Sequence, residues 1–323
     1  MNRPGFVDLQ ANGLLGISFS TDDLNIDTAR TITEAMISRG TAAYCPTVIT
    51  GPREMYKRNL GIIAEAMKDP DMGPHLLGIH MEGPFFSPEP GVRGAHELQY
   101  IRDASVEEYK KWEEWSDGNI AILTIAPERP GAIELISYAV SQGCLVSLGH
   151  HSAKPDVMKA AVDAGAKLCT HLGNGAPTRS PRADNPLWFE LSCDELVADV
   201  ITDGLHVPTE FIEVVLRCKT PDRVVVVSDV SPLAGLPQGE YFAFGEKILI
   251  QPSGLISLPE TGALGGSHST MLECMNHLAS LKRLTEDQLW VAGYDRPLAL
   301  LGRTLDGVDG PGVSFDGAQF VLG

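Results

Sequence analysis

The segment RVVVVSD, residues Arg223–Asp229, is a short run of β-branched residues that ends in a carboxylate. Such a run is typical of a strand that is buried on both faces, as in a parallel sheet covered by helices. Similar short apolar segments precede it: Gly5–Gln10, Thr41–Val48, His75–Glu82, Asn119–Ala126, Cys144–Gly149, Lys167–His171 and Leu196–Thr202. Together with Arg223–Asp229 they predict eight strands.

Helical segments lie between these strands. Among them are Thr28–Arg39, Glu54–Lys68, Pro130–Gln142, Lys154–Ala164 and Thr209–Arg217. Eight strands joined by crossover helices predict an α/β fold of the (β/α)8 TIM-barrel type. The length of 323 residues and the hydrophobic fraction of 43% suit one large barrel.

Two segments interrupt this alternation. Residues from about 238 to 262 read as a β-hairpin inserted after the eighth strand, and the final barrel helix is expected to start near Ser267. The tail after Leu301 is rich in Gly and Asp and predicts a loop with a short strand at Gln319–Leu322. We therefore expect a barrel domain over residues 1–302, including the hairpin, and a C-terminal tail over residues 303–323.

The charge balance limits the partners that the protein can have. Lys and Arg number 25 against 42 Asp and Glu, which gives a net charge of −17. An acidic surface repels nucleic acid and anionic membranes, so neither is expected as a partner. The chain shows no apolar run of about 20 residues, no signal-peptide segment and no CxxC pair among its six cysteines. These features predict a reduced cytoplasmic protein.

Polar side chains follow the predicted strands at the end where barrels of this type carry their active sites. Four of them end four different strands: Glu82, His150, His171 and Asp229. Taken singly, each is more often a structural residue than a ligand. Their convergence on one barrel mouth predicts a site for a cation such as Zn²⁺ with one position left for water.

Nine segments occur in a specific order: PGFVDLQANG, GIHMEGPFF, RGAHE, LTIAPE, VSLGHHSA, AGAKLCTHLGNGAP, ITDGLHV, VVVVSDVSPLAGLPQGEY and GALGGSHSTM. In this order they resemble the N-acetylglucosamine-6-phosphate deacetylase family, which belongs to the amidohydrolase superfamily. The resemblance covers the chain from Pro4 to about Gly302. It implies a metal-dependent hydrolase that deacetylates N-acetylglucosamine 6-phosphate or a related N-acetyl amino sugar.

The resemblance also implies a role for each residue of the site. Glu82, His150 and His171 match the metal ligands, Asp229 matches the general base and acid, and His96 resembles the histidine at the scissile carbonyl. One divalent ion per subunit is implied, with Zn²⁺ favoured and Fe²⁺, Co²⁺ or Mn²⁺ also suited to these ligands. His151 leaves a one-residue ambiguity, and the position directly after Gly149 favours His150 as the ligand.

Substrate contacts are implied for four further residues: Asn174, Gly175, His206 and Arg182. Arg182 lies near the position of a phosphate-binding arginine that a partner subunit can supply in this family, and Arg179 is a second candidate in the same loop. An arginine pair in a Pro-rich loop of an acidic protein is equally typical of surface ion pairs.

Gln10 and Asn12 occupy the position where many amidohydrolases carry an HxH pair that holds a second metal ion. Amides are poorer ligands than imidazoles, so we interpret this pair as a vestigial second-metal position and expect a single ion. The alternative interpretation, given equal weight, is that both amides cap the end of the strand.

The chain departs from the family in three respects, one of which is that His151 and the loop with Arg179 and Arg182 are unusual for it. We expect this chain to lack most of the β-sandwich beside the barrel, and to form a nearly bare barrel with a small β remnant and a homodimer that covers the exposed face. Asn174-Gly175-Ala176 replaces the usual Asn-Ala-Met, and the smaller side chains enlarge the sugar pocket. Two alternatives therefore remain: an amidohydrolase acting on an N-acyl amino acid or another acetamido substrate, or a non-catalytic sugar-binding relative.

Overall fold

The computed structural model describes residues 2–180, 182–305 and 307–323. Its largest sheet has eight strands in the order β11-β10-β9-β8-β7-β6-β5-β2, and each neighbouring pair in that order is parallel. The strands are β2 (Phe6–Ala11), β5 (Thr41–Ile49), β6 (Ile79–Glu82), β7 (Ile120–Ile125), β8 (Leu145–Leu148), β9 (Leu168–Cys169), β10 (Val197–Ile201) and β11 (Val224–Val227). All eight coincide with predicted strands, so the predicted (β/α)8 barrel is confirmed.

The seam between β2 and β11 closes the barrel through side chains and single bridges. Asp8 accepts hydrogen bonds from the backbone N–H of Ser228 at 3.1 Å and from the Ser228 hydroxyl. Ala11 forms an isolated parallel bridge with Val230, and the Asn12 N–H donates to the Val230 carbonyl at 3.0 Å. Burial raises the pKa of the Asp8 carboxyl to about 6, although the hydrogen bonds from Ser228 oppose this shift.

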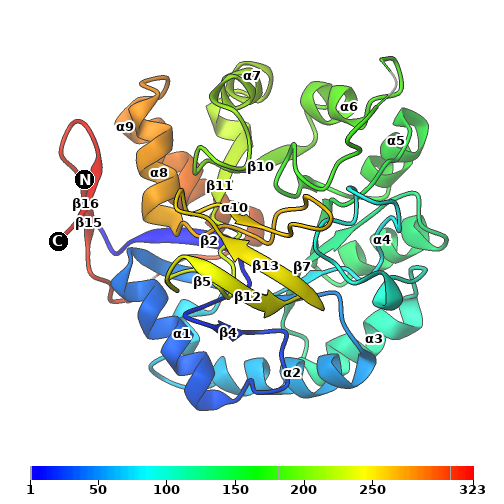
Figure 1. Ribbon diagram of the computed structural model, residues 1–323, viewed down its shortest axis with the longest axis horizontal. Coiled ribbons are helices and arrows are strands. Elements are labelled where there is room, and N and C mark those ends of the chain that lie inside the picture. Colours follow the sequence, from blue (N-terminus) through cyan, green and yellow to red (C-terminus); the bar gives the residue numbers. More distant parts are fainter. Residues whose placement is uncertain (1, 181, 306) are drawn as a thin grey trace.

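Helices surround the strands on the outside of the barrel (Figure 1). The α-helices are α1 (Ile26–Ser38), α2 (Arg53–Ala66), α3 (Val106–Trp115), α4 (Ala132–Ser141), α5 (Pro155–Asp163), α6 (Pro186–Ser192), α7 (Thr209–Lys219), α8 (Met271–Ser280), α9 (Glu286–Trp290) and α10 (Arg296–Leu301). Shorter turns are η1 (Gly73–His75), η2 (Leu98–Tyr100), η3 (Pro221–Arg223) and the π-helical η4 (Val291–Asp295). Within the described residues, no helix combines the length and the apolar character needed to span a membrane.

Helix α8 begins later than the sequence suggested. A capping box formed by Thr270 and Glu273 sets its start at Met271. The residue predicted to begin the helix, Ser267, instead forms a parallel bridge with Val230. The prediction was wrong by four positions because this stretch completes backbone hydrogen bonds beside β11 before the helix starts.

A small antiparallel sheet lies across one end of the barrel (Figure 1). It contains β12 (Gly239–Ala243), β13 (Glu246–Ile250) and β14 (Ile256–Ser257), within the segment where the sequence predicts a hairpin. Its apolar side chains form a separate cluster of buried residues: Leu233, Ile248, Ile250, Ile256 and Leu258. This cluster fixes the sheet to the loop that follows β11.

Both ends of the described chain meet in a second small sheet, at the edge of the view in Figure 1. It contains β1 (Asn2–Arg3), β15 (Val313–Phe315) and β16 (Phe320–Leu322), of which the sequence predicted only the last. Phe320 packs against Phe6 and Trp290, with ring centroids 5.0 Å apart in both pairs. A short ribbon of β3 (Gly13–Leu14) and β4 (Ile17–Ser18) completes the strands. The division into a barrel over 1–302 and a tail over 303–323 stays a prediction.

Candidate active site

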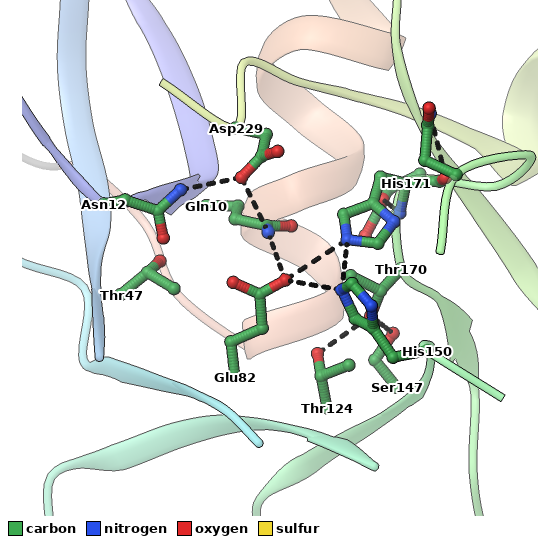
Figure 2. A network of polar contacts seen from close by, with 12 residues as sticks. Gln10, Asn12, Thr47, Glu82, Thr124, Ser147, His150, Thr170, His171 and Asp229 are labelled. Atoms are coloured by element: carbon green, nitrogen blue, oxygen red, sulfur yellow. Dashed lines mark hydrogen bonds and ion pairs between the residues drawn. The ribbon is translucent and has the colours of Figure 1, made fainter. Parts of the chain in front are cut away.

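Glu82, His150 and His171 come together at the carboxyl ends of β6, β8 and β9 (Figure 2). Glu82 Oε1 lies 3.4 Å from His150 Nε2 and 3.2 Å from His171 Nε2. The two Nε2 atoms are 3.1 Å apart. All three side chains are buried, and their three donor atoms face one small volume.

The three donor atoms fit a metal ion. His150 Nδ1 lies 2.9 Å from the Val92 carbonyl, which can only accept, so Nδ1 carries the proton and Nε2 is a free lone pair. Metal–ligand bonds of about 2.1 Å in a tetrahedral arrangement place neighbouring ligand atoms roughly 3.4 Å apart, close to the observed spacing. Within the described residues, this is the one group of His, Cys, Asp and Glu side chains that gathers in this way.

The protonation of the cluster also favours a cation. Burial alone would raise the pKa of Glu82, but the neighbouring imidazoles of His150 and His171 hold it well below its usual range. Burial lowers the pKa of His150. Burial acts in the same direction on His171, but the nearby Glu82 outweighs it and raises the His171 pKa to about 9. The Glu82 carboxylate is therefore ionised and has a protonated His171 beside it. A divalent ion can supply the same positive charge in place of the His171 proton.

The backbone at three site residues is strained. His150, His171 and Asp229 have φ of 52°, 32° and 49°, in the left-handed region that side chains other than glycine rarely adopt. The strain at His171 is supported by Asp199 on β10, whose carboxylate accepts the His171 backbone N–H. Residues in such conformations cost of order 1–3 kcal/mol each and persist where the surrounding fold holds them.

Asp229 follows β11 and faces the cluster. Its Oδ1 accepts hydrogen bonds from Asn12 Nδ2 at 2.7 Å and Gln10 Nε2 at 2.9 Å (Figure 2). Burial, followed by the charge of Glu82, raises the pKa of Asp229 to about 7. A carboxyl group with such a pKa can take up and release a proton near neutral pH.

Gln10 links the carboxylates of Glu82 and Asp229. Its Nε2 donates both to Glu82 Oε1 at 2.8 Å and to Asp229 Oδ1 at 2.9 Å. Asn12 also donates to Asp229, so both amides bind carboxylates of the site, and their interpretation as a vestigial second-metal position or as a strand cap stays a prediction. Gln10 Oε1 and Asn12 Oδ1 are buried without a partner among the described atoms.

A cavity of about 210 Å³ opens above the cluster. Its walls include Asn174, Gly175 and His206, which the sequence predicted to contact substrate, and His96. The His96 ring lies 4.5 Å from that of His150, and burial lowers the pKa of His96 to about 3, so this imidazole is neutral.

Glycines shape the cavity around His150. A Cβ atom on Gly175 would lie 2.7 Å from His150 Nδ1, and one on Gly94 would lie 3.2 Å from His150 Cε1. Phe86 covers another side of the imidazole at a ring distance of 4.5 Å. His150 is therefore closely surrounded on several sides.

Other predicted residues lie outside the cavity. Arg179 and Arg182 are exposed and do not line it, and the Arg182 carbonyl accepts a hydrogen bond from Trp188 Nε1 at 3.0 Å. His151 Nε2 lies 3.0 Å from Glu190 Oε1, so it is His150 that belongs to the cluster. The sequence missed Phe244, which reaches the cavity from the turn between β12 and β13 and belongs to no motif.

A (β/α)8 barrel whose strand ends gather two imidazoles and two carboxylates defines a hydrolase of the amidohydrolase class. No protein-family model matches the chain. The mouse N-acetylglucosamine-6-phosphate deacetylase is 32% identical over 310 residues, which cover 93% of this chain and 74% of the relative. The Vibrio furnissii enzyme of the same name is 29% identical over 299 residues, which cover 93% of this chain and 73% of that relative. The chain belongs to the N-acetylglucosamine-6-phosphate deacetylase family.

Solved structures support this assignment. The deacetylase from Mycobacterium smegmatis superimposes with a TM-score of 0.87 and 25% identity, covering 100% of this chain and 88% of that one. The enzyme from Pasteurella multocida gives a TM-score of 0.87 and 29% identity, covering 99% and 83%. A mutant of the Mycobacterium smegmatis enzyme was solved in complex with N-acetyl-D-glucosamine-6-phosphate.

Proposed function

We propose that this chain removes the acetyl group from N-acetylglucosamine 6-phosphate or a closely related N-acetyl amino sugar. The observation that carries the proposal is the buried set of Glu82, His150 and His171 beside Asp229, in one cavity of a chain from this family. The intact set argues against a non-catalytic sugar-binding relative.

Glu82, His150 and His171 would hold one divalent ion, with Zn²⁺ favoured by the donor set and Fe²⁺, Co²⁺ or Mn²⁺ as alternatives. When bound, such an ion supplies Lewis-acid chemistry to the amide carbonyl and lowers the pKa of water. Gln10 and Asn12 fill the vestigial second-metal position, and their donated hydrogen bonds hold Asp229 in place.

The chain's own residues move the protons. Asp229 accepts a proton from the attacking water and returns it to the departing amine, which is too basic to leave as an anion. The neutral His96 ring carries one N–H that can donate to the oxygen of the carbonyl as charge develops there. Asn174, Gly175 and His206 would contact the sugar and its phosphate from the cavity wall.

No lysine or arginine of the described residues lines the cavity. We therefore assign the exposed Arg182 to the phosphate of a substrate bound in the other subunit of a homodimer. Residues 1–302 form the catalytic barrel in this proposal, and residues 303–323 form the tail. The described cysteines are free and four of them are buried, which supports a reducing, cytoplasmic location.

The test is a screen for acetate release from N-acetylated sugars with and without a 6-phosphate, and from N-acetyl amino acids. We expect turnover of the phosphorylated amino sugar, with Asp229→Asn lowering kcat by about 100-fold or more while the metal content stays unchanged. Preferred hydrolysis of an N-acetyl amino acid would establish the alternative specificity. An Asp229→Asn variant with normal turnover would remove the assigned acid/base.

A further inference from the structure

The carboxylate of Asp203 has no role in the reaction above, although it contacts a residue that lines the cavity. Asp203 follows β10, three residues before His206. Its side chain has 0% exposure and that of His206 has 4%. Asp203 Oδ2 lies 2.8 Å from His206 Nδ1, so the two side chains form a direct hydrogen bond.

The Asp203 carboxylate is held by three further donors. The backbone N–H groups of Leu205 and His206 donate to Oδ1 at 2.8 and 3.0 Å, and the Ser267 hydroxyl donates to Oδ2 at 3.0 Å. Burial alone would raise the pKa of Asp203, but the hydrogen bond with His206 and the backbone N–H groups of Leu205 and His206 lower it to about 2. The carboxylate is therefore ionised at neutral pH and can only accept.

An acceptor at this place determines which ring nitrogen of His206 carries hydrogen. Nδ1 must donate to Asp203, so in the neutral ring Nε2 is left as the unprotonated nitrogen. His206 Nε2 has no partner among the described atoms, and the ring lines the cavity. The arrangement reserves Nε2 for a group that enters the cavity.

Ser267 connects this pair to the acid/base group. Its backbone N–H donates to the Asp229 carbonyl at 2.8 Å, and its carbonyl accepts from the Ser231 N–H at 2.8 Å. The residue that binds Asp203 is thus fixed on both sides to the segment that carries Asp229. A shift of one group would be transmitted to the other through two hydrogen bonds.

We infer that Asp203 is a positioning residue that fixes the tautomer and orientation of His206. Ser267 joins Asp203 to the segment that carries Asp229. The inference rests on the proposed function only where it treats His206 as a contact to substrate. Replacing Asp203 by Asn offers Nδ1 an amide that can donate, so the fixed proton position is lost.

The first measurement is the ¹⁵N spectrum of protein labelled at its nine histidines, with the His206 signals identified from their loss in His206→Gln. We expect a ring with hydrogen on Nδ1 in the unaltered protein, a result that does not depend on any variant at Asp203. Asp203→Asn should shift His206 toward hydrogen on Nε2. The exposed Asp163→Asn is the matched control and should leave the spectrum unchanged.

The second measurement is a double-mutant cycle in kcat/KM on the best substrate of the screen. Asp203→Asn should lower kcat/KM by about 10- to 100-fold, mainly through KM, and should have no further effect in His206→Gln. Additive losses, or hydrogen on Nε2 in the unaltered protein, would overturn the inference. The ¹⁵N spectrum can be recorded whether or not the protein is active. If the spectra are as expected but no substrate releases acetate, the proposed function is rejected and the positioning role of Asp203 stands.

Discussion

At the scale of single residues, the left-handed backbone at His150, His171 and Asp229 shows that the site is built against local preference. The side chains of these three residues point into the site because the backbone directly after their strands adopts the left-handed conformation. The fold supplies the free energy that holds them, and a bound cation then gains a site with its donors already in place.

The strain at His150 predicts an unusual order of stabilities. His150→Gly and His150→Ala both remove the imidazole, but only glycine adopts φ of 52° without cost. We expect the glycine variant to have the higher free energy of unfolding, by about 1 kcal/mol, in urea titrations of metal-free protein. At the exposed helical position Glu134 the order should reverse, since glycine weakens a helix relative to alanine. Equal stabilities of the two His150 variants would show that the backbone there is not strained.

The polar residues that end strands could be predicted from the sequence, since each of them directly follows a run of apolar residues. Glu82, His150, His171 and Asp229 were all found in this way. The bridge made by Gln10 between Glu82 and Asp229 could not be found, because it joins residues separated by 72 and 219 positions. The same holds for Ser267 and Asp203, which only the folded chain brings together.

At the scale of elements, the seam between β2 and β11 depends on the protonation of Asp8. The folded pKa of about 6 lies above the ordinary value of 3.8, so the folded state binds the proton more tightly. This stabilisation is fully present below pH 3.8 and is lost as the pH rises through 6.

We therefore expect Asp8→Asn to remove a pH dependence. Between pH 4 and 7 the unaltered protein should lose up to about 3 kcal/mol of unfolding free energy relative to the variant. Urea titrations at a series of pH values measure the difference. A difference that stays constant over this range would contradict a raised pKa at the seam.

The hairpin of β12 and β13 places Phe244 in the cavity wall, in a left-handed conformation with φ of 52°. Phe244→Ala removes apolar surface from the pocket and should raise KM about tenfold with little change in kcat. Phe242 on the adjoining strand β12 is 78% exposed, so Phe242→Ala is a matched control that should leave both constants unchanged. A similar KM for the two variants would place Phe244 outside the substrate site.

The elements that the sequence predicted well are those buried on both faces, whose composition differs from that of loops. The very short strands β1, β3, β4, β14 and β15 were missed, since two or three residues show no periodicity of their own. The equally short β9 was predicted because it lies within the longer segment Lys167–His171. The start of α8 was placed at Ser267 because the sequence of residues 267–270 is as compatible with a helix as with a backbone bridge to Val230.

At the scale of the whole molecule, the three proposed ligands come from β6, β8 and β9 and join one side of the barrel. An ion that binds only the folded chain raises its stability, by about 4 kcal/mol when the free ion is a thousandfold above its Kd. A chelator should therefore lower the Tm by several degrees, as followed by calorimetry, while His171→Asn should show no such shift. An unchanged Tm on chelation of metal-loaded protein would argue against the site.

The tight enclosure of His150 by Gly94, Gly175 and Phe86 has a kinetic consequence. An imidazole confined on these sides cannot rotate away to release an ion, so exchange must proceed through the open cavity while the ligand stays in place. Occupation of the cavity by a sugar would then close the exit route. The rate at which a bound ion is lost during turnover would then not follow from its equilibrium affinity. A side chain introduced at position 175 would change both the rate of loss and the affinity.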